Sequence, residues 1–425
     1  MMLLSIIISA LIFNFSKNHT IRQLCIIISS LIVYWHFVGN GIFPSCFLIL
    51  ATIACKFLIN DKVLKFSYVV CAYVLSVASV YACARMCNYT EISLPIGFSI
   101  IMFSGISLMV DERKYDVRYS ILDSITFLVF FPKILAGPIE RMRSFRDQTQ
   151  HPNNKDIWNN LYLGFKIVVF GAFIKYVCSD FLDSYVENYY TGVNQLISIF
   201  LFAIQFYLDF WAYSLLAIGI AKVYGVNLMF NFNKPYRSTS FKDFWKRWNI
   251  SLSSWLKDYI YLPLLSYGHI FRWVCIIIVF LISALWHGTT LPFIIWGMVH
   301  ATCIILEKSK IVATFARTKV YSLIVICVVS MLWQTFRFHD INSLYLGYSR
   351  LFVPSDIDVE LISVFVVSII LMFVAESKKI ERLIMSVTNF TFKEKVLEVV
   401  LISTLILSLL FLCSDVSSQF FYFKY

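Results

Sequence analysis

Two histidines, His287 and His300, stand inside the apolar stretch 277–305. An ionisable side chain at membrane depth is costly, so it generally faces an interior cavity and marks a pathway or a reaction centre. Gly288 follows His287 and Pro292 comes soon after, a pattern that indicates the end of one helix and the start of the next. Helices that break at this depth are tolerated only when they are buried in protein or line a wet cavity. His287 is therefore expected at a buried break.

The imidazole of His287 could act as a general base. Its ordinary pKa near ~6.5 suits it to take a proton from an alcohol as that alcohol attacks a thioester. The alternative is a histidine that hydrogen-bonds a carbonyl group at a helix end, and the residues alone do not decide between the two. His300 lies one turn after Trp296, and for it packing or a hydrogen bond is the favoured interpretation.

The stretch 241–264 has the pattern of one amphipathic helix. Ser240 with Asp243 predicts a capped start, and Pro263 limits the far end. Such a helix is typical of a segment that lies flat at the membrane interface. At ~100° per residue, its large apolar side chains gather on one face and its charged ones on the other. The apolar set is Phe241, Phe244, Trp245, Trp248, Leu252, Trp255, Leu256 and Tyr259.

Two further polar residues lie in or beside apolar surfaces. Asn249 borders the aromatic stripe and should point toward protein, so its amide needs a partner. Asp209 lies in the apolar stretch 207–236, where it either contacts a proton or substrate or pairs with a neighbouring Lys or Tyr. Pairing is the favoured interpretation for Asp209.

The elements that must position these residues are membrane helices. Of the 425 residues, 59% are hydrophobic and 14% are charged, against ~45–50% and ~25% in typical soluble domains. We expect an all-α polytopic membrane protein, with residues 1–425 as a single integral membrane domain. It should have about 11–13 membrane segments, plus amphipathic or re-entrant helices. The expected segments are 2–15, 21–38, 41–59, 66–84, 95–110, 119–137, 158–178, 195–224, 271–286, 291–306, 319–336, 360–375 and 396–414.

The formal net charge is +11, and the Lys and Arg residues lie in short loops between apolar segments. There they set topology and attract anionic lipid, and no nucleic-acid partner is expected. The most basic loops, 140–147, 234–247 and 307–319, are separated by even numbers of expected spans, so the positive-inside rule places all three in the cytoplasm. This predicts a multi-pass protein of the cell inner (plasma) membrane. Residues 1–15 lack a basic leader and a small-residue cleavage site, so they are expected to be a first membrane segment.

The 11 cysteines form no disulfide framework, since most lie within apolar stretches and act there as small hydrophobes. Cys83 and Cys87 are the nearest approach to a metal-binding pair, and no second pair accompanies them. No metal site is therefore expected. The sequence patterns of phosphate-binding loops, serine hydrolases and zinc proteases are also absent.

Taken in order, several stretches resemble the membrane-bound O-acyltransferase family, especially its bacterial branch that modifies cell-surface polymers by alginate or peptidoglycan O-acetylation and D-alanyl transfer. The resemblance covers 95–305, the expected acyltransferase core, and leaves 306–425 as C-terminal membrane helices. The matching pieces are PIGFSIIMFSGISLMVD at 95–111, FFPKILAGPI at 130–139, MFNFNKPY at 229–236, DFWKRWNISLSSWLKDYIYLPL at 243–264 and ALWHG at 284–288.

The resemblance implies roles for individual residues. The histidine of the W-H-G position is catalytic in that family, which implies catalysis by His287. A second polar residue belongs to the R-W-[HN] position, where this chain has Asn249; many bacterial polymer-modifying members have histidine there. We therefore expect Asn249 to orient substrate or to donate a hydrogen bond to the developing oxyanion. The residues expected to bind substrate are Trp286, Trp248, Asp209 and Trp245.

This chain departs from the alginate-type pattern in two places. Trp211, Ala212 and Leu215 replace the small residues and acid that usually follow D-F, and LSYGHIFRW after Leu264 replaces a Gly-Gly-Asn-Arg loop. These departures leave alginate open as the acceptor, and the resemblance implies only the acceptor's class, a hydroxyl of a surface polysaccharide or peptidoglycan.

The implied donor is acetyl-coenzyme A or another acyl thioester, with no bound cofactor and with an extracytoplasmic acyltransferase partner protein completing the transfer. One alternative keeps the fold and transfers D-alanine to teichoic acid. Another class is a polysaccharide transporter or flippase, in which His287 and Asp209 relay protons.

Overall fold

The chain is seen in a computed structural model that describes residues 2–38, 42–60, 73, 97–150, 157–188, 190–266, 268, 271–315, 318–338, 340–386 and 391–412. Within these ranges the regular structure is helical and no strand occurs, which confirms the all-α prediction. Most of the expected segment 66–84 and the Cys83–Cys87 pair lie outside the described residues.

The chain divides into two compact units. Unit 1 holds residues 1–168 and 216–229, and unit 2 holds 169–215 and 230–425. The single integral membrane domain stays a prediction.

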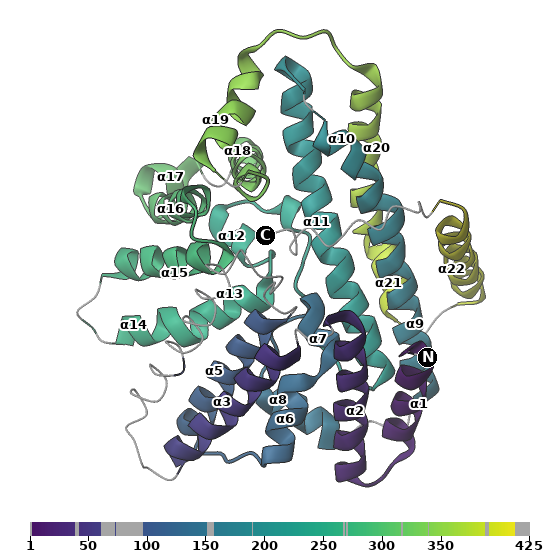
Figure 1. Cartoon of the computed structure of the whole chain (residues 1–425). Coiled ribbons are helices and arrows are strands. Elements are labelled where there is room, and N and C mark those ends of the chain that lie inside the picture. The colour runs from purple at the N-terminus through teal and green to yellow at the C-terminus, as the bar shows by residue number, and fades with distance from the viewer. Residues whose placement is uncertain are drawn as a thin grey trace. The chain divides into compact units, whose positions relative to one another are not determined.

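Unit 1 is built from paired apolar helices (Figure 1), with α1 packed on α2, α3 on α5 and α2 on α6. The expected segment 119–137 is interrupted at Phe130, because Pro132 fits only the first turn of a helix and a new helix begins there. Gly137 ends that helix as an ordinary exit. The bounds are α1 Met2–Phe15, α2 His19–Val38, α3 Ile42–Asn60, α5 Phe98–Tyr115, α6 Ile121–Val129, α7 Phe131–Ala136, α8 Met142–Gln150 and α9 Ile157–Phe173.

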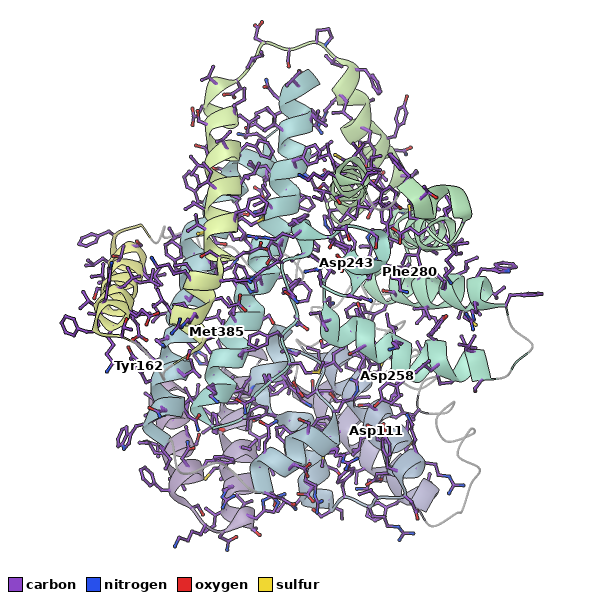
Figure 2. The ribbon with its side chains drawn as sticks, turned by 180° about the vertical axis from the view of Figure 1, so that it is seen from behind. Asp111, Tyr162, Asp243, Asp258, Phe280 and Met385 are labelled. Atoms are coloured by element: carbon purple, nitrogen blue, oxygen red, sulfur yellow. The ribbon has the colours of Figure 1, made fainter. Side chains whose placement is uncertain are left out.

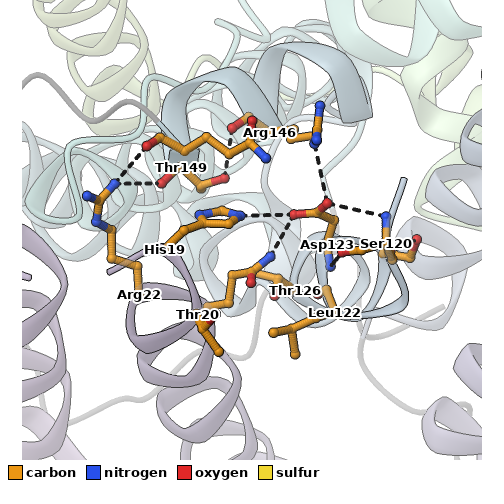
Figure 3. Close-up of polar contacts among 12 residues, drawn as sticks. His19, Thr20, Arg22, Ser120, Leu122, Asp123, Thr126, Arg146 and Thr149 are labelled. Carbon is orange, nitrogen blue, oxygen red and sulfur yellow. Dashed lines mark hydrogen bonds and ion pairs between the residues drawn. The ribbon is translucent and has the colours of Figure 1, made fainter. Parts of the chain in front are cut away.

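A buried carboxylate, Asp123, ties three helices of unit 1 together (Figure 3). It caps the start of α6 with Ser120 in a reciprocal pair of hydrogen bonds. Gln23 of α2 donates to Oδ1 at 2.6 Å, and Arg146 of α8 lies 3.3 Å from Oδ2. His19 also approaches Oδ1 at 3.1 Å. Because a buried charge needs paired and hydrogen-bonded surroundings, this arrangement fixes α2, α6 and α8 against one another.

The longest described helix, α11, begins at Gly192 in unit 2 and ends at Val223, in a segment assigned to unit 1. In unit 2, α15 packs on α16 (Figure 1). Its bounds are a π-helical turn Ile174–Ser179, α10 Asp183–Glu187, α11 Gly192–Val223, a short helix Pro235–Arg237, α12 Phe241–Trp245, α13 Ile250–Leu256, a π-helical turn Lys257–Tyr261, α14 Leu262–Ser266, α15 Arg272–His287, α16 Leu291–Leu306, α17 Lys310–Phe315, α18 Lys319–Leu332, a 3₁₀ turn Trp333–Phe336, α19 Ile341–Ser349, α20 Val359–Ala375, α21 Lys378–Met385 and α22 Phe392–Leu412.

Several helices are long and apolar enough to cross a membrane. In the described part of the chain they are His19–Phe37, Ile157–Glu187, Gly192–Val223 and Lys319–Phe336, and the pair Val359–Ala375 with Lys378–Met385 could form a fifth span bent by 55°. Four further apolar helices of the same part are shorter. The chain is thus a helical membrane protein, and the number of 11–13 crossings stays a prediction.

Candidate active site

The expected single helix over 241–264 is wrong, because the chain breaks in its middle. Ser240 caps α12 as predicted, accepting a hydrogen bond from the backbone of Asp243 at 3.0 Å. α12 then ends at Trp245, and α13 begins only at Ile250. Pro263 lies inside the next helical segment rather than ending one.

Asn249 makes that break. Its backbone is left-handed, with φ 41° and ψ 56°, a conformation that asparagine tolerates better than most residues. The residue is 6% exposed, and its side-chain amide makes no hydrogen bond to any residue that the structure describes. Its backbone carbonyl accepts from Ser253 at 2.9 Å. A largely buried asparagine, whose amide bonds no described residue, is therefore held at a helix break.

His287 stands at a second break, as predicted. α15 ends at His287, and the N–H of Gly288 donates to the carbonyl of Ala284 at 3.0 Å. α16 begins at Leu291 with Pro292 in its first turn. His287 as a whole residue is half-buried.

Aromatic rings of described residues surround the imidazole of His287. Trp286 lies 4.4 Å away between ring centroids, Phe336 4.9 Å, Trp296 5.2 Å and Phe293 6.2 Å. Trp286 itself is half-buried beside the histidine. These rings place apolar walls beside the imidazole nitrogens.

Aromatic contacts of unit 2 connect the His287 break with the Asn249 break. Phe336, against the imidazole, lies 5.4 Å from Phe206 of α11, and Phe206 lies 5.7 Å from Trp248, the neighbour of Asn249. Trp248 is 3% exposed. The predicted pair of polar residues therefore flanks one continuous aromatic cluster.

Trp245 and His300 form a second polar contact in this cluster. The Trp245 indole N–H donates to Nδ1 of His300 at 3.3 Å, and His300 is fully buried. Trp245 also packs on Phe280 of α15, labelled in Figure 2, with 5.4 Å between ring centroids. His300 therefore has the packing and hydrogen-bonding role favoured for it, and Trp245 faces this histidine.

Asp209 is paired rather than left open to substrate. Nζ of Lys175 lies 2.8 Å from Asp209 and 2.6 Å from Asp180, and all three side chains are at most 5% exposed. The single ammonium group of Lys175 thus pairs with two buried carboxylates, and such pairing is what makes a buried charge tolerable. This is the ion-pair role favoured for Asp209, and its expected contact with substrate stays a prediction.

Sequence reasoning missed the aromatic residues that join the two breaks. Phe206, Trp333 and Phe336 come from α11 and from the 3₁₀ turn after α18, and Trp333 lies 4.6 Å from Trp248. In the sequence each of them is one of many aromatic residues in apolar segments, so no local pattern marks it as part of a site. Within the described residues no group of three or more His, Cys, Asp or Glu side chains is placed to hold a metal ion.

The fold and this site define a polytopic helical membrane protein with an imidazole at a helix break inside an aromatic wall. Residues 45–348 match the model of MBOAT, the membrane-bound O-acyltransferase family. The chain belongs to this family.

The chain is similar to curated proteins with three different names. The probable alginate O-acetylase AlgI of Azotobacter vinelandii is 31% identical over 63% of this chain and 55% of its own length. The peptidoglycan O-acetyltransferase of Helicobacter pylori is 33% identical over 52% of this chain and 45% of its own length. The teichoic acid D-alanyltransferase of Bacillus subtilis is 26% identical over 48% of this chain and 57% of its own length. The chain spans about half the length of the curated relatives that it matches.

Proposed function

We propose that this protein is an O-acyltransferase that moves acetyl groups from a cytoplasmic acyl thioester, acetyl-coenzyme A, to hydroxyls of a cell-surface polysaccharide or peptidoglycan. In this proposal the protein is located in the inner (plasma) membrane. The observation that carries the proposal is the imidazole of His287, which lies at the end of α15 and is surrounded by aromatic rings. The relatives named as O-acetylases of alginate and peptidoglycan point to the same chemistry.

In the proposed reaction, His287 acts as general base. Its imidazole takes the proton of the attacking hydroxyl while that oxygen bonds to the thioester carbonyl carbon. The resulting oxyanion collapses, the carbon–sulfur bond breaks, and the sulfur leaves with the proton from the imidazolium. Aromatic walls slow hydrolysis by keeping water from the thioester.

Asn249 supplies the second function in this proposal. The Asn249 amide, which bonds no described residue, can donate an N–H to the oxyanion that forms during attack without breaking a hydrogen bond to those residues. Trp248 and Trp286, beside the two polar residues, are proposed to line the path of the substrate. A separate extracytoplasmic protein is proposed to complete transfer to the polymer.

Replacing His287 tests the proposal. His287→Ala should abolish O-acetylation of the surface polymer while export of the polymer continues, as measured by mass spectrometry of surface glycans and by total polymer at the cell surface. His36→Ala, at an exposed position of α2, is the matched control and should leave acetylation unchanged. Loss of export with His287→Ala would favour the transporter class instead, and full acetylation by this variant would refute the base role.

A second candidate is D-alanyl transfer to teichoic acid, favoured by relatives of that name at 25–26% identity. Membranes containing the protein should transfer label from acetyl-coenzyme A, and not from a D-alanyl carrier protein. The opposite result would replace acetyl by D-alanyl as the acyl group.

A further inference from the structure

Unit 2 has an open pocket of about 480 Å³ whose wall is one face of α21. The wall positions on α21 follow the spacing i, i+3, i+4 and i+7, which places them on a single side of a helix. Leu383 and Ile384 on another side are buried against the unit. Met385, labelled in Figure 2, lies at the end of this helix. The residues that line the pocket are Lys234, Lys378, Glu381, Arg382, Met385 and Ser386.

The pocket is positively charged and has several hydrogen-bond donors. Three cations line it against one carboxylate. Glu381 pairs with Lys234 at 2.7 Å, and Arg382 pairs with Glu394 of α22 at 3.2 Å. Lys378 makes no ion pair with a described residue. Guanidinium and ammonium groups converging on an open space, with a hydroxyl beside them, suit phosphate oxygens as ligands.

Lys234 enters this pocket from a strained backbone position. Its φ is 53°, and among the described non-glycine residues only Asp116, Lys234 and Asn249 have positive φ. Lysine has none of the local hydrogen bonding that eases this conformation for asparagine. Strained positions persist where the surrounding structure fixes them, and they cluster at functional sites.

The segment that ends in Lys234 is also hydrogen-bonded to the break that contains Asn249. The N–H of Asn233 donates to the carbonyl of Arg247 at 3.0 Å, and the N–H of Ile250 donates to the carbonyl of Asn231 at 2.9 Å. These two bonds join residues 231–233 to the backbone on both sides of Asn249. Lys234 follows directly after residue 233, so a short segment connects the pocket to the candidate active site. Lys234 belongs to the basic loop 234–247, which the positive-inside rule predicts to be cytoplasmic.

We propose that this pocket binds the phosphate groups of the acyl donor, a phosphorylated thioester of the coenzyme A class. The assignment rests on the proposed function, because that function requires such a donor on the cytoplasmic side. Lys378 and Arg382 contact the phosphates, Ser386 adds a hydroxyl, and Lys234 links binding to the backbone beside Asn249. A phospholipid headgroup has the same phosphate chemistry and is the other source of a ligand.

Binding of coenzyme A to the full-length protein in phosphatidylcholine nanodiscs tests the proposal. All variants are made in the His287→Ala background, so that turnover does not contribute. Lys378→Gln/Arg382→Gln should raise the Kd for coenzyme A about tenfold, the loss expected for two partly exposed charge-assisted contacts. Lys379→Gln removes one charge from the same helix outside the pocket lining and should change the Kd less than about twofold. Pantetheine, which lacks phosphate, should bind all variants equally.

Each outcome decides the assignment. An unchanged Kd for coenzyme A in the double variant overturns it. Loss of a bound anionic phospholipid from the double variant in native mass spectrometry, with coenzyme A binding intact, assigns the pocket to a headgroup and also overturns it. Weakened coenzyme A binding supports it whether or not His287→Ala abolishes polymer acetylation, so a failure of the proposed function is detected separately.

Discussion

Replacing Asn249 by glycine separates the backbone role of this residue from the role of its side chain. Asn249→Gly keeps the left-handed turn, because glycine adopts φ near 41° without strain. It removes the amide, which makes no hydrogen bond to a described residue, so no folded-state hydrogen bond is lost. We expect the free energy of unfolding to change by less than about 1 kcal/mol.

The catalytic effect should be much larger than the effect on stability. Losing one donor to a developing oxyanion costs about 10²–10³ in kcat. Asn249→Ala also lacks the donor, so its kcat should fall by the same factor. Its free energy of unfolding should be about 1 kcal/mol lower than that of Asn249→Gly, because the alanine Cβ disfavours the left-handed conformation. Asn249→His keeps an N–H donor and should recover part of the activity. The assays are acetyl transfer by isolated membranes and thermal unfolding of the purified protein in detergent.

Two results would refute this reasoning. If Asn249→Gly transfers acetyl groups at the wild-type rate, the amide takes no part in the reaction. If Asn249→Ala unfolds at the same temperature as Asn249→Gly, the left-handed backbone at this position is not what selects asparagine. The two outcomes are independent, so each role of Asn249 is tested by itself.

Two further predictions concern buried charges. Lys175→Met leaves the carboxylates of Asp180 and Asp209 without their shared cation, so it should destabilise the protein by about 3–5 kcal/mol, and adding Asp209→Asn should recover part of the loss in thermal unfolding. Burial raises the pKa of Glu140 above its ordinary value of 4.5, which means that the folded chain binds this proton more tightly than the unfolded chain. Stability should therefore fall as the pH rises through the interval above 4.5, and Glu140→Gln should flatten that fall when unfolding is followed between pH 4.5 and 7.5.

The membrane helices were predictable because a continuous apolar run has clear ends. The expected segments 2–15 and 291–306 coincide with α1 and α16, and the end of α15 at His287 followed from the glycine after it. Breaks inside a run were harder to predict. The apolar spacing of 241–264 continues on both sides of Asn249, so periodicity alone favours one helix although the chain makes two.

The polar candidates were predictable one at a time, whereas their surroundings were not. Asp209 was recognisable as an acid that needs a partner, and Lys175 is that partner, but 34 positions separate them in the chain (209 − 175). The rings that enclose His287 come from three separate segments, and only the fold brings them together. Long-range packing of this kind leaves no local trace in one sequence.

Both polar residues assigned to the reaction stand at helix breaks, and a physical reason connects the two facts. A break inside an apolar helix frees backbone groups that must find partners away from water. Residues 231–233 supply them at Asn249, and the helix end at Gly288 supplies one at His287. Once the backbone is satisfied in this way, the side chain at the break is not needed to cap it, and we propose that it can take part in the reaction. A buried acid in the middle of an unbroken helix, such as Asp209, instead requires a charged partner, and its carboxylate is engaged in that ion pair.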